Sequence, residues 1–321
     1  MLKVYSFQKG AVTEASPKEL ATVSVCWADC TAPSEEELKE ISENTNITLD
    51  ELNEALDQEE RPKVSDLENY SLIIVRTPWN ENGEISTLPI AIFVSKTKNN
   101  VITLTLQETR AIKRIKELLK INKVELHEKG VGFFTYTLID EILSEYFTII
   151  DHIEETIDEI EEEVVQKPGK KTIENIFAVK KTLIFFHRAL TANREVISSI
   201  EKEYITQIDK KNIKRFRNLY NDAIQLIDTE TTYRDILTGT LDIYLSSISN
   251  NLNQVVKTLT VMTSFILMPT LIAGIYGMNF DTGSQFNMPE ILWKYGYFFA
   301  IGLMVLSVLL MYLFFRRKGW I

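Results

Sequence analysis

The residue best placed for chemistry in this sequence is a neutral amide, Asn279, within the segment YGMNF at 276–280. No Asp, Glu, Lys, Arg or His occurs from Thr258 to Phe280, so every polar group in this run is uncharged. A ring of amide oxygens can accept hydrogen bonds from the water shell of a divalent cation without stripping it, and Mg²⁺ gives up its waters reluctantly. A carboxylate ring would bind such an ion more tightly and release it more slowly.

The segment that leads to Asn279 is expected to be a helix with one neutral face of small and hydroxyl residues. At about 100° per residue, that face holds Val256, Leu259, Thr263, Leu267, Thr270, Gly274 and Gly277. Such a face is typical either of close packing against a second span or of a wall turned toward water, and we weigh the two equally. In a passage for ions, the apolar members would be constrictions that close by dewetting. One helix per subunit cannot enclose a passage, so a passage requires a symmetric ring of subunits.

Asn279 does not share this face as long as the chain stays helical. It falls about half a turn away from Thr270 on an ideal helix. To point at a common axis it must leave helical geometry, and Gly277 makes a local break easy because glycine has no side chain. We therefore expect the helix to end near Gly277 and Asn279 to lie at the outer mouth.

Two uncharged runs, 258–280 and 295–315, are the only ones in the sequence long enough to cross a bilayer. They lie back to back and are separated by the loop 281–294. The sequence therefore predicts a two-helix membrane hairpin, with the first helix ending in YGMNF.

The basic residues flanking the hairpin predict its orientation. Lys257 precedes the first run, and Arg316, Arg317 and Lys318 follow the second in a basic tail, 316–321. Because cytoplasmic flanks carry the excess of Lys and Arg, both termini are expected in the cytoplasm and the loop outside. The first residues of the sequence lack the apolar core of a signal peptide, which agrees with a cytoplasmic body.

Residues 131–257 show helical spacing throughout and are expected to form a cytoplasmic stalk. The pattern that starts near Asn212 continues into the first span and predicts one helix of about 65 residues, roughly 100 Å long, against a bilayer of ~30 Å. Before it, two antiparallel helices are expected around a turn at 167–170. The first of them carries eight acids between Asp151 and Glu163, which we interpret as a solvated helix face in preference to a metal sensor.

Residues 1–130 mix strand and helix signals and are expected to form an α/β domain. Ser34 with Glu37, and Thr48 with Glu51, have the spacing of capping boxes and predict two helix starts. One further helix and at least four strands of a sheet are expected, the helix at 111–121 and the strands at 20–27, 70–77, 88–95 and 100–107.

The composition excludes several classes of protein. A net charge of −10 argues against nucleic acid and anionic lipid as partners and mildly favours cations. Cys26 and Cys30 are too few for a disulfide framework, and we expect both to be small buried hydrophobes. No nucleophile–base arrangement is apparent, so we do not expect an enzyme. Three histidines are scattered without metal-ligand spacing: His127, His152 and His187.

YGMNF at 276–280, followed by Met288-Pro289-Glu290 in the loop, resembles the CorA family of magnesium transport proteins. Similar segments extend over essentially the whole chain: ERPK at 60–63, YTLIDEIL at 136–143, EEEV at 161–164 and YLSSISNNLNQVVKTLT at 244–260. The resemblance implies a funnel-shaped homopentameric channel in the cell membrane, with an α/β cytoplasmic domain, long helices and a two-helix transmembrane hairpin. Its expected activity is uptake of hydrated Mg²⁺ driven by the membrane potential.

The resemblance also implies roles for single residues. Gly277, Met278 and Asn279 would form the ion-selective ring at the mouth. Pore-lining positions are implied at Asn253, Val256, Leu259, Thr263, Leu267, Thr270 and Gly274. Family members often have Met at two of these places, where this chain has Val256 and Leu267, so the constriction is expected to be apolar but differently shaped.

CorA-type channels are closed by Mg²⁺ bound between their cytoplasmic domains, so the resemblance implies that Mg²⁺ is both the transported and the regulatory ion. Asn218 stands where we would expect an Asp. Asp222, or Asp66 and Glu68 in the N-terminal domain, are the candidates to replace it as ligands. The outer loop also departs from the family, because DTGSQFN is inserted at 281–287.

Two alternatives to a Mg²⁺ channel remain open. One is a related transporter of Zn²⁺, Co²⁺ or Ni²⁺, since relatives with this motif differ in cation and direction; Co²⁺ and Ni²⁺ are also candidate cargo of a Mg²⁺ channel. The other is a non-conducting metal sensor tethered to the membrane. A divalent ion that crosses 100 mV gains roughly 4.6 kcal/mol, at ~2.3 kcal/mol per charge, so the lack of a nucleotide-binding motif agrees with transport.

Overall fold

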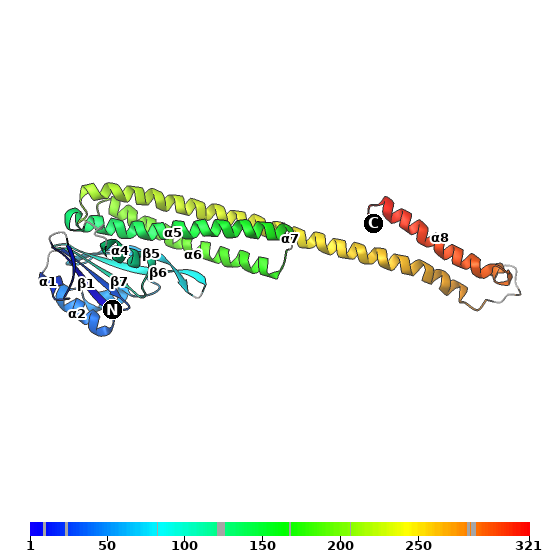
Figure 1. The fold of residues 1–321 in the computed structure, drawn as a ribbon, viewed down its shortest axis with the longest axis horizontal. Coiled ribbons are helices and arrows are strands. Elements are labelled where there is room, and N and C mark those ends of the chain that lie inside the picture. Colours follow the sequence, from blue (N-terminus) through cyan, green and yellow to red (C-terminus); the bar gives the residue numbers. More distant parts are fainter. Residues whose placement is uncertain are drawn as a thin grey trace. The chain divides into compact units, whose positions relative to one another are not determined.

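The computed structural model describes residues 1–8, 11–22, 25–81, 83–120, 126–166, 168–205, 207–280, 283 and 287–321. These residues fall into two compact units, Met1–Leu241 and Asp242–Ile321 (Figure 1). The first unit holds a sheet and most of the helices. The second holds both uncharged runs.

Among the described residues, one seven-stranded sheet forms the centre of the first unit, in the order β2-β1-β3-β7-β6-β5-β4. β3 and β7 are parallel, whereas the other neighbours are antiparallel. The strands are β1 (Leu2–Gln8), β2 (Ala11–Ala15), β3 (Val25–Thr31), β4 (Lys63–Asp66), β5 (Tyr70–Glu81), β6 (Glu84–Ser95) and β7 (Asn99–Thr105). The expected α/β fold with at least four strands is confirmed.

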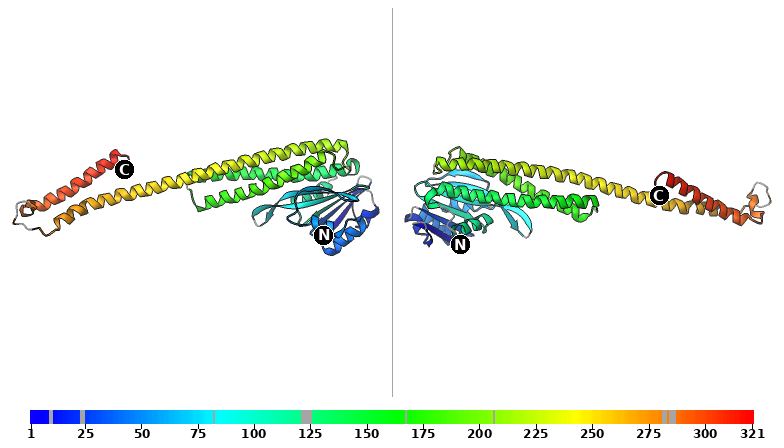
Figure 2. Two further views of the ribbon diagram at one scale, coloured as in Figure 1. Left: turned by 180° about the vertical axis from the view of Figure 1, so that it is seen from behind. Right: turned by 45° about the horizontal axis from the view of Figure 1, so that its top comes forward.

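Helices cover both faces of this sheet (Figures 1 and 2). One layer is made of α1 (Glu19–Thr22), α2 (Glu35–Thr45) and α3 (Leu49–Ala55); the other is made of α4 (Arg110–Lys120), α5 (Leu126–Gln166), α6 (Lys170–Glu201) and the start of α7 (Lys210–Tyr276). Successive strand residues point to opposite faces, so Trp27 joins the core under the long helices while Cys26 and Ala28 join the core under α1–α3. Cys26 and Cys30 are free and fully buried, as expected.

Local sequence signals account for the starts of α2 and α3. Ser34 and Glu37 form a reciprocal capping box, and Thr48 and Glu51 form a second one. In each box the hydroxyl accepts the N–H three residues on while the carboxylate accepts the N–H of the cap, so two orphan donors are satisfied. Both predicted helix starts are confirmed.

The strand expected at 20–27 is partly wrong, because residues 20–22 are helical. α1 occupies Glu19–Thr22, and the strand begins only at Val25. The local cause is a turn in which the N–H of Glu19 donates to the carbonyl of Ser16 at 2.8 Å while the Glu19 carboxylate accepts the N–H of Ser16 at 3.3 Å. Leu20 still enters the core, from a helix instead of a strand.

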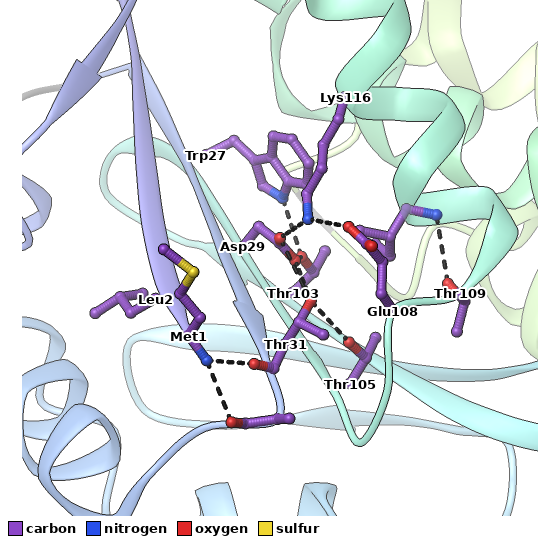
Figure 3. A network of polar contacts seen from close by, with 12 residues as sticks. Met1, Leu2, Trp27, Asp29, Thr31, Thr103, Thr105, Glu108, Thr109 and Lys116 are labelled. Atoms are coloured by element: carbon purple, nitrogen blue, oxygen red, sulfur yellow. Dashed lines mark hydrogen bonds and ion pairs between the residues drawn. The ribbon is translucent and has the colours of Figure 1, made fainter.

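A buried ion pair joins Lys116 on α4 to Asp29 on β3 of the sheet (Figure 3). Asp29 on β3 is 1% exposed and lies 2.6 Å from Lys116 Nζ, which also contacts Glu108 at 2.8 Å. Beside it, Trp27 Nε1 donates to Thr103 Oγ1 at 3.0 Å. Burial raises the pKa of Asp29, and the contact with Lys116 opposes that rise. Asp29 without Lys116 would be a buried unpaired charge, so the pair favours one arrangement of α4.

The long helices agree with the sequence expectation. α5 and α6 run antiparallel as the predicted pair, and α7 is a single helix of 67 residues that ends at Tyr276. α5 is interrupted at Gly130, whose φ of 75° is in the region that favours glycine. Lys167, in the predicted turn, and the side chain of His127 lie outside the described residues.

The second unit contains the rest of α7, the short 3₁₀ helix η1 (Pro289–Leu292) and α8 (Gly296–Arg317). α7 and α8 are both long and apolar enough to cross a membrane. Most of the inserted segment 281–287 lies outside the described residues, with Gly283 and Asn287 as the exceptions.

Candidate ion-passage site

Within the second unit, α7 contacts α8 and the C-terminal tail along one side. Val261 is buried there, and the rings of Phe265 and Phe315 meet edge to face, 5.9 Å apart. Near the end of the chain, Lys257 Nζ donates to the carbonyl of Gly319 at 2.9 Å and lies over the ring of Trp320. These contacts define which face of α7 is occupied by its own chain.

The neutral face of α7 is not the face that packs against α8. All the predicted pore-lining residues are exposed in the single chain: Asn253, Val256, Leu259, Thr263, Leu267, Thr270 and Gly274. The apolar members are strongly so, with Leu259 64% and Leu267 60% exposed. A Cβ placed on Gly274 would meet no atom within 4 Å. The small residues of this face therefore do not serve packing within the hairpin, which removes one of the two interpretations that the sequence left equal.

Three threonine hydroxyls in this part of α7 donate hydrogen bonds within the helix. Thr270 Oγ1 donates to the carbonyl of Ile266 at 2.7 Å, and Thr260 and Thr258 make the same bond four residues back. A hydroxyl that donates in this way keeps its lone pairs free as acceptors. The face therefore offers neutral oxygen acceptors to water and no charge.

The end of α7 has the geometry expected for Asn279. The last helical bond is from the N–H of Gly277 to the carbonyl of Ala273 at 2.9 Å, and Met278 then closes a tighter turn onto Ile275. Asn279 lies outside the helix and is exposed, as are Gly277 and Met278. The expected departure from the helix after Gly277 is confirmed.

The structure indicates how Gly277 contributes to this break. It does not adopt a left-handed φ. Instead, a Cβ on Gly277 would lie 3.2 Å from the carbonyl oxygen of Ala273 and 3.5 Å from that of Gly274. The glycine therefore provides room for the tight last turn, and a larger residue would push against the helix end.

The regulatory candidates do not come together within one chain. Asp66 is exposed and pairs with Lys96 at 2.8 Å, and Glu68 and Asn218 are also exposed. Asp222 on α7 is half-buried, and burial raises its pKa. Among the described residues, no group of three or more His, Cys, Asp or Glu side chains is arranged to hold a metal ion.

The structure adds one acidic residue that sequence reasoning missed, Asp140 on α5. Burial raises the pKa of Asp140, and the negative charge of Asp222 raises it further. The hydroxyl of Tyr136 is close enough to be affected by the same acids. Burial raises the pKa of Tyr136 most, and the negative charges of Asp140 and Asp222 raise it further. No sequence pattern singles out Asp140, because it is a half-buried residue beside the apolar stripe of α5 that contains the buried Leu138, Ile139 and Ile142.

Comparisons with known proteins agree on one family. The family model described as "CorA-like Mg2+ transporter protein" matches residues 23–317. The chain is 33% identical over 326 residues to the cobalt/magnesium transport protein CorA of Methanocaldococcus jannaschii, covering 100% of both, and 34% identical over 272 residues to that of Thermotoga maritima, covering 84% of this chain and 76% of the other. The complete structure of the Methanocaldococcus jannaschii CorA magnesium transporter superposes with a TM-score of 0.89 at 31% identity, over 100% of this chain and 99% of that one.

Proposed function

The chain belongs to the CorA-like Mg²⁺ transporter family, and from this premise we propose which of its residues select, pass and control the ion. It is a divalent metal ion transporter of the membrane and not an enzyme. The observation that carries the proposal is the exposed neutral face of α7, which turns away from α8 and leads to Asn279 just beyond the end of the helix.

Five copies of the chain form a ring in this proposal, with the neutral faces of α7 turned toward a common axis. The support is physical: Leu259 and Leu267 are about two-thirds exposed in a single chain, and one helix cannot enclose a passage. A symmetric homopentamer, as implied by the family, covers those side chains with their own copies.

Asn279 forms the selective ring at the outer mouth, with Gly277 and Met278 shaping the turn that presents it. The amide oxygens accept hydrogen bonds from the first water shell of Mg²⁺, which the ion retains. Because the ring is neutral, it holds the hydrated ion weakly enough to let it move on.

Below the mouth, the passage narrows at apolar residues and widens at polar ones. Thr270, Thr263 and Asn253 offer oxygen atoms to the hydrated ion. Leu267, Leu259 and Val256 form apolar rings that lose water when they approach one another, and dewetting blocks a hydrated ion. A small rotation of α7 would then be enough to open or close the path.

The ion moves inward down the electrical gradient. The positive-inside rule supports this direction, because Lys257 before the first span and Arg316 and Arg317 after the second favour the cytoplasmic side for both flanks. A divalent ion gains roughly 4.6 kcal/mol across 100 mV, so no nucleotide is needed.

Control by cytoplasmic Mg²⁺ is assigned to the acids of the first unit. Asp222 remains the leading candidate, and Asp140 joins it because the two carboxyl groups interact. Asn218 would be a weaker, neutral oxygen ligand in the same region. Asp66 and Glu68, which are exposed on β4 and after it, would contribute only from a neighbouring subunit.

A flux assay tests the proposed function. Purified protein in liposomes with an inside-negative potential should take up Mg²⁺, and Co²⁺, Ni²⁺ and Zn²⁺ should be compared as competitors. Uptake of Mg²⁺ that depends on the potential supports the channel. Zn²⁺ flux that depends on a proton gradient would favour the related transporter, and no flux of any of the four would favour a sensor.

A further inference from the structure

A side chain of the outer loop is bonded to the residue that ends the pore helix. The hydroxyl of Tyr276 donates to Glu290 Oε1 at 2.9 Å, and both side chains are partly buried. Tyr276 is the last residue of α7 and lies three residues before Asn279. A hydrogen bond to an ionised acceptor is about twice as strong as one between neutral groups.

The backbone of Glu290 is fixed as well, at the opposite helix. Its carbonyl oxygen accepts the N–H of Trp293, the residue that follows η1, at 3.1 Å. A Cβ on Gly296, the first residue of α8, would lie only 2.1 Å from this same oxygen. Only glycine permits that approach, so α8 begins directly against the Glu290 backbone.

Glu290 thus connects three elements: the end of α7 by its side chain, η1 by its own position, and the start of α8 by its carbonyl. Met288, the residue that caps η1, has a φ of 39°, which is strained for a residue with a side chain. A strained cap persists only where the surroundings hold it. Glu290 is therefore held from two sides, by the hydroxyl of Tyr276 and by the start of α8.

We propose that Glu290 is a positioning residue for ion selection: through Tyr276 it holds the turn at 277–280 and so the amide of Asn279. This rests on the proposed function of the Asn279 ring. The competing role for an acid near the mouth is a surface charge that attracts cations and touches them itself. The geometry favours positioning, because one carboxylate oxygen is directed at Tyr276.

Two substitutions separate the roles, since each removes one property and keeps the other. Tyr276→Phe keeps the ring and the negative charge but removes the hydrogen bond. Glu290→Gln keeps an oxygen that can accept from Tyr276 but removes the charge. Positioning makes Tyr276→Phe harmful and Glu290→Gln mild, whereas charge attraction makes the reverse pattern.

The measurement is the ratio of Mg²⁺ to Ca²⁺ uptake in liposomes, with the size of the purified assembly as a check on folding. We expect Tyr276→Phe and Glu290→Ala each to lower the ratio by about tenfold, the loss expected for one charge-assisted hydrogen bond. The double variant should be no worse than either single one, because both break the same bond. Glu290→Gln should keep at least half of the ratio.

A glycine pair on α8 supplies a second, independent test. Gly296→Ala displaces Glu290 and should lower the ratio, while Gly302→Ala should not, because a Cβ there meets nothing within 4 Å in the chain. The inference is overturned if Tyr276→Phe leaves the ratio unchanged, if the two single losses add, or if Glu290→Gln is as harmful as Glu290→Ala.

Failure of this inference can be told from failure of the proposed function. If wild-type protein carries no Mg²⁺, or if Asn279→Ala keeps normal discrimination, the selective ring itself is wrong. If wild-type conducts, Asn279→Ala loses discrimination and Tyr276→Phe behaves as wild-type, only the positioning role of Glu290 is wrong. If the Tyr276→Phe protein no longer assembles, the uptake ratios of Gly296→Ala and Gly302→Ala decide. A lower ratio in Gly296→Ala alone supports the positioning role, and equal ratios overturn it.

Discussion

Asp140 on α5 and Asp222 on α7 form an interacting acidic pair: burial raises the pKa of Asp140, and the charge of Asp222 raises it further. Burial also raises the pKa of Asp222. Two carboxylates that are costly to ionise together are stabilised when a divalent cation binds between or beside them. The pair lies between α5 and α7 within the first unit, and we propose that cytoplasmic Mg²⁺ binds there.

We predict that Asp222→Asn and Asp140→Asn each weaken closure by internal Mg²⁺, by about tenfold in the concentration required. Since the pKa values of both carboxyls are raised, protons compete with Mg²⁺, and closure should need more Mg²⁺ as pH falls toward those raised values. The measurement is Mg²⁺ efflux against internal Mg²⁺ at several pH values. Asp66→Asn is the matched control; if it alone changes closure, the regulatory ligands lie on the N-terminal domain.

A second prediction concerns Glu145 on α5, which accepts a hydrogen bond from Thr77 on β5 at 3.1 Å. Burial raises the pKa of Glu145 from 4.5 to about 7, against the opposing effects of Thr77 and Arg110. The folded state therefore binds this proton more tightly than the unfolded state does. Stability should fall as pH rises from about 4.5 to about 7 and level off above, by at most about 3 kcal/mol.

Glu145→Gln should remove that decline, because the amide keeps the contact with Thr77 and does not titrate. Thermal unfolding followed by fluorescence between pH 5 and 8 measures the slope. Glu159→Gln, an exposed acid on the same helix, should leave the slope as in wild-type. An unchanged slope in Glu145→Gln would show that other groups cause it.

Features that depend on local sequence were predictable here. The capping boxes at Ser34 and Thr48 involve residues three apart, and they are found as expected. The spans were predictable because a bilayer demands an uncharged run of fixed length. The helix end before Asn279 followed from a face count, which needs only helical periodicity.

Features that depend on distant residues were not predictable. β2 and β4 are short edge strands with charged residues, and they are defined by pairing with neighbours more than by their own pattern. The interaction of Asp140 with Asp222 joins residues 82 positions apart in sequence. The hydrogen bond from Tyr276 to Glu290 joins residues 14 positions apart across the loop, and no periodicity predicts it.

A third prediction tests the proposed apolar rings of the ion passage. Leu267 is 60% exposed on the neutral face of α7. Leu267→Ser should keep water in the narrow region and leave the channel partly open at high internal Mg²⁺, because a hydroxyl ring does not dewet. Leu267→Met, which conserves volume and polarity, is the control and should close normally. Normal closure in Leu267→Ser would place the gate at another ring.

The last prediction concerns the proposed selective ring of Asn279. Asn279 lies beyond the end of α7 and is exposed, so its substitution removes no contact that the helix needs. Asn279→Ala should abolish selective Mg²⁺ uptake while the protein still assembles, and retained selective uptake would contradict the assigned role. Asn279→Asp makes the sharper comparison, because it changes one atom per subunit and adds charge. A carboxylate ring binds the hydrated ion more tightly and releases it more slowly, so half-saturation should shift to lower Mg²⁺ while maximal flux falls. If Asn279→Asp instead lowers the half-saturating Mg²⁺ concentration and raises the maximal flux, release from this ring does not limit transport.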